Sequence, residues 1–199
     1  MTRFIWLTVF LCGCSSMAKD FGRDAEVQVP AYLGQWYEHA RTPNDFEDNE
    51  PHRDGQDFGA CFNSTADYQL VSQDEIRVTN RCTRQAIDGD ELYQDIAHGK
   101  AKIKHNSNNR RLTVAFGPWI ARAIQWLFAD RDGNYWIYAL GPINDDGQYS
   151  WSIVSGPDKD YIFILTRDKD IDSQTQANIL EAAQAEGLPV DDLIFRQLP

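Results

Sequence analysis

The strongest constraint on the fold is a series of eight short segments rich in β-branched and aromatic residues. Apolar and polar residues alternate in several of them, as expected of strands that bury one face. Runs of Gly, Asn, Asp, Ser and Pro between the segments indicate tight turns. The predicted strands are residues 34–41, 60–71, 75–83, 92–104, 110–117, 134–140, 148–155 and 160–167. Eight short strands in series favour an antiparallel barrel or sandwich over a fold that alternates strands with helices.

One helix is predicted after the last strand, over residues 173–186, where Ala and Leu recur on one face. Asp172 or Ser173 can cap its first turn, and Gly187 is suited to end it. The tail, residues 191–199, could return to pair with the sheet. No internal repeat and no second domain is apparent in the sequence.

The N-terminal residues indicate export. A short basic start is followed by an apolar run over residues 4–11 that is too short to span a bilayer, which predicts a signal peptide over residues 1–13. The tetrapeptide LCGC resembles the lipobox of bacterial lipoproteins, and this implies acylation of Cys14. Residues 14–29 would then be a tether and residues 30–199 the folded domain. The alternative is an ordinary secreted protein in which a cysteine merely falls near the cleavage site.

The net charge bears on how the protein would attach to a membrane. The chain has 19 Lys and Arg against 30 Asp and Glu, and losing residues 1–13 removes one Arg, so the mature charge is 18 − 30 = −12. Such an acidic surface argues against nucleic acid and against binding to anionic headgroups. We therefore expect attachment through acyl chains, and Ser15 fits sorting of a bacterial lipoprotein to the cell outer membrane.

The chain has four cysteines, and two of them lie in the expected domain. Once Cys12 leaves with the signal peptide and Cys14 carries lipid, Cys61 and Cys82 remain as a pair in an oxidising compartment, where we expect a disulfide. That bond would remove the last candidate for a nucleophilic thiol. The four histidines show no metal spacing, and no phosphate-binding loop or nucleophile elbow is present, so the sequence predicts no metal, no cofactor and no enzyme.

Several motifs together resemble the lipocalins, and more closely the bacterial outer-membrane lipocalins of the Blc type. Gly34-Gln35-Trp36 opens the first strand, and Arg167 ends the eighth, just before the helix. The matching stretches are YLGQWYEHAR (32–41), FGPW (116–119), SGPDKDYIFILTR (155–167) and LIFRQLP (193–199). The resemblance covers residues 30–199. It implies an eight-stranded up-and-down β-barrel with a C-terminal helix, open at one end and holding a lipid-like ligand.

Strand direction in such a barrel brings two predicted residues together at the closed end. If Trp36 begins the first strand there, the eighth strand returns to the same end and delivers Arg167. A guanidinium stacked on an indole is favourable by ~0.5–2 kcal/mol, so this pair is expected to close the barrel. The loops 42–59, 84–91 and 156–159, together with 118–133, should then lie at the mouth.

Side-chain alternation gives candidate ligand contacts inside the barrel. The inward candidates are Trp36, Glu38, Tyr68, Tyr138 and Trp151. An interior carboxylate is costly unless it has a partner, takes a proton or meets a ligand head group, so both a structural and a ligand role for Glu38 are open. The disulfide would lie at the mouth, and a symmetric turn about Gln73 puts Cys82 opposite residue 64, so the bridge needs a bulge.

The loop 118–133 contains many large apolar groups for a barrel mouth. The residues predicted to form a mouth lid are Trp119, Ile124, Trp126 and Phe128. Two alternatives stay open: a homodimer or membrane contact, and an extra turn folded on the barrel wall.

The resemblance and the lipobox together predict an outer-membrane-anchored lipocalin. It would bind, and store or transport, a lysophospholipid or fatty acid for envelope maintenance, with apolar burial holding the chain and a few polar groups orienting the head. The alternatives are a lipocalin-fold enzyme of the isomerase or de-epoxidase type, and a structural envelope lipoprotein with a filled barrel.

Overall fold

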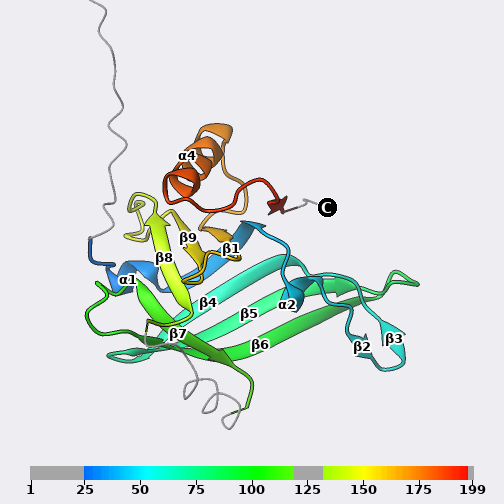
Figure 1. The fold of residues 1–199 in the computed structure, drawn as a ribbon. Coiled ribbons are helices and arrows are strands. Elements are labelled where there is room, and N and C mark those ends of the chain that lie inside the picture. The colour runs from blue at the N-terminus through cyan, green and yellow to red at the C-terminus, as the bar shows by residue number, and fades with distance from the viewer. Residues whose placement is uncertain (1–24, 119–131, 197–199) are drawn as a thin grey trace, which may run out of the picture.

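The computed structural model describes residues 25–118 and 132–196, which form a closed antiparallel barrel with a helix outside it (Figure 1). Eight strands pair in chain order, and the last pairs back with the first. They are β1 (Gly34–Arg41), β4 (Phe62–Ser72), β5 (Glu75–Gln85), β6 (Leu92–Ile103), β7 (Arg111–Phe116), β8 (Tyr135–Leu140), β9 (Trp151–Ser155) and β10 (Phe163–Thr166). Each overlaps one predicted strand. The up-and-down barrel is therefore confirmed.

The C-terminal segment contributes a helix and a ninth strand. The predicted helix is α4 (Ser173–Ala185), whose first turn is capped by the Asp172 carboxylate, which accepts from the Thr175 amide at 2.6 Å. Gly187, with φ of +66°, follows its end, as expected of a residue free to adopt the left-handed region. The tail returns as β11 (Ile194–Phe195), which pairs with the last two residues of β1. That pairing is confirmed.

The barrel has an apolar core inside and a second one outside it. Val78, Leu112 and Val154 belong to the inner cluster, around Trp36. The outer cluster joins Ile153 and Ile164, on the outward faces of β9 and β10, to Ile179 on α4. Figure 1 shows α4 (orange to red) lying beside this part of the wall. Several strands are therefore apolar on both faces.

The closed end is filled by the chain that leads into β1. The short helix α1 (Val29–Tyr32) places Tyr32 in the inner core, and Val27 is also buried there, three residues before the predicted start of the domain. The Val27 amide donates to the Asn108 carbonyl, and the Arg110 guanidinium donates to the Ala25 carbonyl. This segment is thus fixed to the β6–β7 loop.

Two bulges change which side chains face inward. In β1 the register with β10 shifts between Glu38 and Ala40, so Ala40 joins the outer cluster and Arg41 turns inward. Strict alternation along β1 predicts that Ala40 shares the inward face of Trp36, and the bulge makes that prediction wrong. In β8 the register with β9 shifts between Ile137 and Ala139.

The first mouth loop, residues 42–59, contains secondary structure that alternation did not predict. It contains the single-turn helix α2 (Asp45–Asp48) and a small hairpin of β2 (His52–Arg53) and β3 (Gln56–Asp57). The helix begins at Asn44, whose side chain accepts from the Glu47 amide. Within the described residues, no helix has the length and apolar character needed to cross a membrane.

Candidate functional site

A cavity of about 560 Å³ lies inside the barrel. Apolar side chains from most of the strands line it, including Val78, Val114 and Leu165. At the mouth end the lining includes Phe46 of α2, whose ring stacks on that of Phe163 at 6.3 Å between centroids. Sites for small molecules are mostly apolar and measure roughly 300–1,000 Å³, so the volume suits one small ligand.

The closed end is sealed by Trp36 and Arg167, the pair predicted to meet there. The Arg167 guanidinium carbon lies 3.6 Å from the centroid of the Trp36 ring, which is fully buried. Arg167 also donates to the backbone carbonyls of Tyr32 and Leu33 at 3.1 and 2.9 Å. Burial lowers the pKa of Arg167 to about 10, so the group stays charged at neutral pH. Trp36 lies beneath the cavity and is absent from its lining.

Four hydroxyl groups form a chain between this seal and the cavity. Tyr135 OH lies 2.8 Å from Tyr32 OH and 3.1 Å from Tyr68 OH, and Tyr32 OH lies 3.2 Å from Ser152 Oγ. Burial raises the pKa of Tyr32 to about 12 and raises the pKa values of Tyr68 and Tyr135 as well, so all three phenols stay protonated. Tyr68 and Tyr135 line the cavity, and we call these four residues the floor chain.

A charged cluster lies at the mouth end of β1. The inward turn of Arg41 brings its Nε to 2.7 Å from Glu47 Oε2 and 3.5 Å from Glu38 Oε1, and its Nη1 donates to Asp48 Oδ2 at 2.8 Å. Burial, and next the negative charge of Glu47, raise the pKa of Glu38 well above its usual range. Burial also raises the pKa of Glu47, whereas the hydrogen bond from Arg41 lowers that of Asp48.

This cluster gives the mouth a group that can change its protonation. Glu38 and Glu47 both line the cavity, and the raised pKa of Glu38 favours its neutral form over a wider pH range than usual. A neutral carboxyl can donate a hydrogen bond as well as accept one, whereas an ionised carboxylate attracts cations. The mouth of the cavity therefore offers hydrogen-bonding and charged groups to the polar head group of a ligand.

Arg84 fixes the loop that carries Glu47. Its side chain is 1% exposed, and its guanidinium donates to the carbonyls of Asn49 and Gly59, both at 2.9 Å, and of Phe46 at 3.1 Å. Its Nε donates to the Asp95 carboxylate at 3.0 Å. One side chain on β5 thus holds α2 and the end of the loop against the barrel wall.

The predicted disulfide between Cys61 and Cys82 is present, with a Cα–Cα distance of 5.5 Å. The expected bulge is also present, between Phe62 and Thr65 of β4, with Asn63 at a φ of +53°. Both cysteines lie in the lining of the cavity near its mouth. Asp95 is close to them, but sulfurs joined in a disulfide are not thiolate ligands for a metal.

The other predicted contacts divide between the two faces of the wall. Glu38 and Tyr68 line the cavity. Tyr138 and Trp151 instead pack on the outer cluster against α4, which corrects their predicted inward placement. The register shift in β8 falls at Tyr138. In β9 the inward positions belong to Ser152 and Val154, so Trp151, which precedes Ser152, faces outward.

The site residues that the sequence reasoning missed include Tyr135, Tyr32 and Arg41. Tyr135 precedes the bulge of β8, so alternation from Ile137 alone would have placed it inward. Tyr32 comes just before the first strand and Arg41 just after a bulge, and neither gives a pattern that alternation detects. The predicted lid residues Trp119, Ile124, Trp126 and Phe128 lie outside the described residues.

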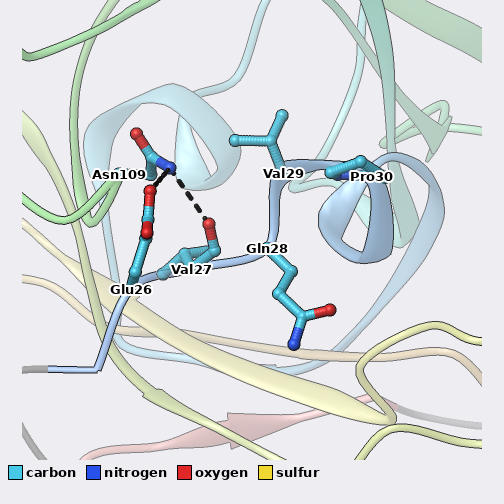
Figure 2. A pocket seen from close by; sticks show the side chains of 6 residues that line it. All are labelled: Glu26, Val27, Gln28, Val29, Pro30 and Asn109. Atoms are coloured by element: carbon cyan, nitrogen blue, oxygen red, sulfur yellow. Dashed lines mark hydrogen bonds between the residues drawn. The ribbon is translucent and has the colours of Figure 1, made fainter.

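A second hollow, of about 570 Å³, lies against the N-terminal segment (Figure 2). Figure 2 shows the Asn109 amide donating to the Glu26 carboxylate and to the Val27 carbonyl, at 3.0 and 3.2 Å. These groups are used to fix the segment to the β6–β7 loop. The hollow is distinct from the barrel cavity, because the two share no lining residue.

Comparisons with known proteins agree with this architecture. A family model described as a lipocalin-like domain matches residues 27–198. The outer membrane lipoprotein Blc of Vibrio cholerae is 26% identical over 194 residues, which cover 97% of this chain and 95% of that protein. Blc of Citrobacter freundii is 31% identical over 169 residues, which cover 84% of this chain and 77% of that one.

A solved structure shows the same fold at low identity. Lobster apocrustacyanin A1 matches with a TM-score of 0.52 at 14% identity, covering 86% of this chain and 82% of that one. The family model extends from the buried Val27 at the closed end to the segment beyond β11, and so includes the whole barrel. The chain therefore belongs to the lipocalin family.

Proposed function

We propose that this protein is an outer-membrane-anchored lipocalin that binds, and stores or transports, a single-chain lipid such as a lysophospholipid or fatty acid. The observation that carries the proposal is the closed barrel with an apolar cavity of about 560 Å³. A barrel of eight strands leaves an interior just wide enough for side chains or for one small ligand. A structural lipoprotein with a filled barrel would not need this space.

The proposed anchor rests on the sequence and on the names of relatives. The tetrapeptide LCGC ends at Cys14, and the relatives from Vibrio cholerae and Citrobacter freundii are named outer membrane lipoproteins. Stable anchoring requires more than one acyl chain, because each buried CH₂ contributes only ~0.8 kcal/mol. A diacylglyceryl group with an amide-linked chain on Cys14 would meet that requirement.

The charged groups of the cavity support a particular kind of head group. The charged lining residues are Glu38, Glu47, Arg81 and Asp95. Acidic groups outnumber basic ones, and Glu38 and Glu47 are largely buried beside Arg41. We therefore place the head group at this mouth cluster, where a head that donates hydrogen bonds or carries a positive charge is favoured over a bare carboxylate.

Lipid extraction from the purified, non-acylated protein tests the proposed function. Mass spectrometry should find one reproducible class of single-chain lipid, and displacement of a fluorescent lysophosphatidylcholine should give a saturable affinity. Filling the cavity with Ala66→Phe should weaken binding, since Ala66 lines it. The matched control is Ala185→Phe, at an exposed position of α4. A protein that is consistently empty and binds no probe would favour the structural alternative.

A further inference from the structure

The floor chain has one more proton than its internal hydrogen bonds can use. It links four hydroxyl groups, of Ser152, Tyr32, Tyr135 and Tyr68, through three contacts of 3.2, 2.8 and 3.1 Å. Each hydroxyl carries one proton, and each contact uses one. Four donors and three contacts leave one O–H without an acceptor among the four.

The ends of the floor chain differ in what surrounds them. At one end Ser152 is fully buried, and within the described part of the chain its hydroxyl contacts only Tyr32. At the other end Tyr68 and Tyr135 form part of the cavity lining. A donor left unpaired in a closed core loses the free energy of its lost hydration, whereas one at the cavity can meet a ligand. The spare proton therefore belongs to Tyr68 or Tyr135.

The tyrosine rings hold these hydroxyls in place. The Tyr32 and Tyr68 rings stack with centroids 5.7 Å apart, and the Tyr135 ring meets the Tyr68 ring edge-on at 6.5 Å. The Trp36 indole N–H donates to the Tyr32 carbonyl at 2.9 Å, so this tyrosine is also tied to the barrel seal. A fixed donor loses little freedom when it binds, which favours a specific contact over accidental satisfaction.

On the basis of the proposed function, we propose that this cavity selects ligands whose leading end, deep in the barrel, carries a hydrogen-bond acceptor. The favoured ligand is an amphiphile with polar groups at both ends: a head at the Glu38 cluster and an oxygen atom, such as that of a hydroxyl or carbonyl group, at Tyr68 and Tyr135. A chain that ends in a methyl group fits the apolar wall but leaves the spare O–H unpaired. The preference for an oxygenated chain end goes beyond the lipid binding that the barrel alone supports.

Matched lipids test this preference directly. We would measure the affinities of lysophosphatidylcholines with C12, C14 and C16 chains, each ending in a methyl or in a terminal hydroxyl, by calorimetry below their critical micelle concentrations. The head group is too polar to enter first, so the chain end reaches the floor. At the chain length that spans the cavity, the hydroxyl lipid should bind about threefold to tenfold more tightly, the effect of one net hydrogen bond.

A double variant identifies the groups responsible. Either single variant still leaves at least one more O–H than contacts at the cavity, whereas Tyr68→Phe/Tyr135→Phe removes both hydroxyls that line it, so the double variant should lose the preference for the hydroxyl lipid while the methyl lipid still binds. The matched control is Tyr138→Phe, because the Tyr138 hydroxyl donates to the Gly156 carbonyl and the residue packs outside the cavity. This control should retain the full preference, and circular dichroism would verify that each variant folds.

The outcomes separate this inference from the proposed function. Equal affinities for the two lipids at every chain length in the unmodified protein would overturn the inference and leave lipid binding intact, as expected if water satisfies the floor. A preference that survives in the double variant would also overturn it. If neither lipid binds at any length, the proposed function fails as well. The comparison in the unmodified protein does not depend on whether a variant folds.

Discussion

Replacing Arg41 with Met should destabilise the protein far more than the loss of an ordinary surface arginine. Its side chain is 4% exposed and lies within ion-pair distance of Glu38, Glu47 and Asp48. Methionine retains much of the volume but leaves these carboxylates without their cation. Removing one partner of a buried ion pair costs about 3–5 kcal/mol, because the remaining charge is then buried without compensation. We expect a loss of that size at pH 7.

Urea unfolding, followed by circular dichroism with the disulfide intact, measures this loss. With a slope of roughly 1–3 kcal/mol per M, the expected change lowers the midpoint by at least about 1 M. The matched control is Arg111→Met. Arg111 also pairs with a carboxylate, of Asp132 at 3.1 Å, and stacks on Trp136, but its side chain is 39% exposed. Because exposed ion pairs contribute about 0–1 kcal/mol, the control should lose little.

The pH dependence of this loss of stability tests whether unpaired buried charge causes it. The destabilisation in Arg41→Met should shrink as pH falls, because protons neutralise the carboxylates that have lost their partner. Adding Glu47→Gln should restore part of the lost stability by removing one of these charges. Equal losses in the Arg41 and Arg111 variants, or a loss independent of pH between 4 and 8, would refute the argument that Arg41 compensates buried charge.

Three further predictions follow from the site and the seal. Burial raises the folded-state pKa of Glu38 above its ordinary value of 4.5, so this group contributes a fall in stability as pH rises from about 4.5 through the raised pKa. Glu38→Gln should remove a slope of up to ~1.4 kcal/mol per pH unit, and an unchanged slope in urea titrations would show that Glu38 ionises normally. The Cys61→Ala/Cys82→Ala variant should lose about 3 kcal/mol, since the bridge closes a separation of 21 residues, and a reduced unmodified protein should match it. Arg167→Lys should cost about 2–3 kcal/mol in thermal unfolding, because an ammonium cannot stack flat on Trp36 and reach the same carbonyls; a change below 0.5 kcal/mol would contradict the assigned role of the seal.

The sequence was sufficient to predict the strand order and the two ends of the barrel. Alternation and turn residues located each strand, and Asp172 and Gly187 marked the ends of α4, because caps and turns act over a few residues. The pairing of Trp36 with Arg167 followed from strand direction in the barrel that the lipocalin resemblance implied. These features depend on local chemistry or on counting strands, so a single sequence carries them.

The inner face was harder to predict, because its details depend on closure of the barrel. The bulges at His39 and Tyr138 reverse the alternation beyond them, and no residue type in the sequence indicated either bulge. Large apolar residues also occur on the outer face, where the partly buried Trp151 packs against the outer cluster, so size and apolarity did not identify the inner side. The floor chain joins residues 103 and 67 positions apart, contacts that appear only in the folded barrel.

The buried Arg84 has a consequence for how fast ligands can exchange. A guanidinium has five N–H donors, and here every nitrogen of the group bonds to an oxygen of the first mouth loop or of Asp95. Opening the loop would break all of the bonds from Arg84 to loop oxygens together, and each of these oxygens would have to find water. On this side the rim should therefore behave as a rigid edge on the timescale of ligand entry. The length of this loop is then no guide to its mobility, and one substitution at Arg84 would convert a fixed edge into a moving one.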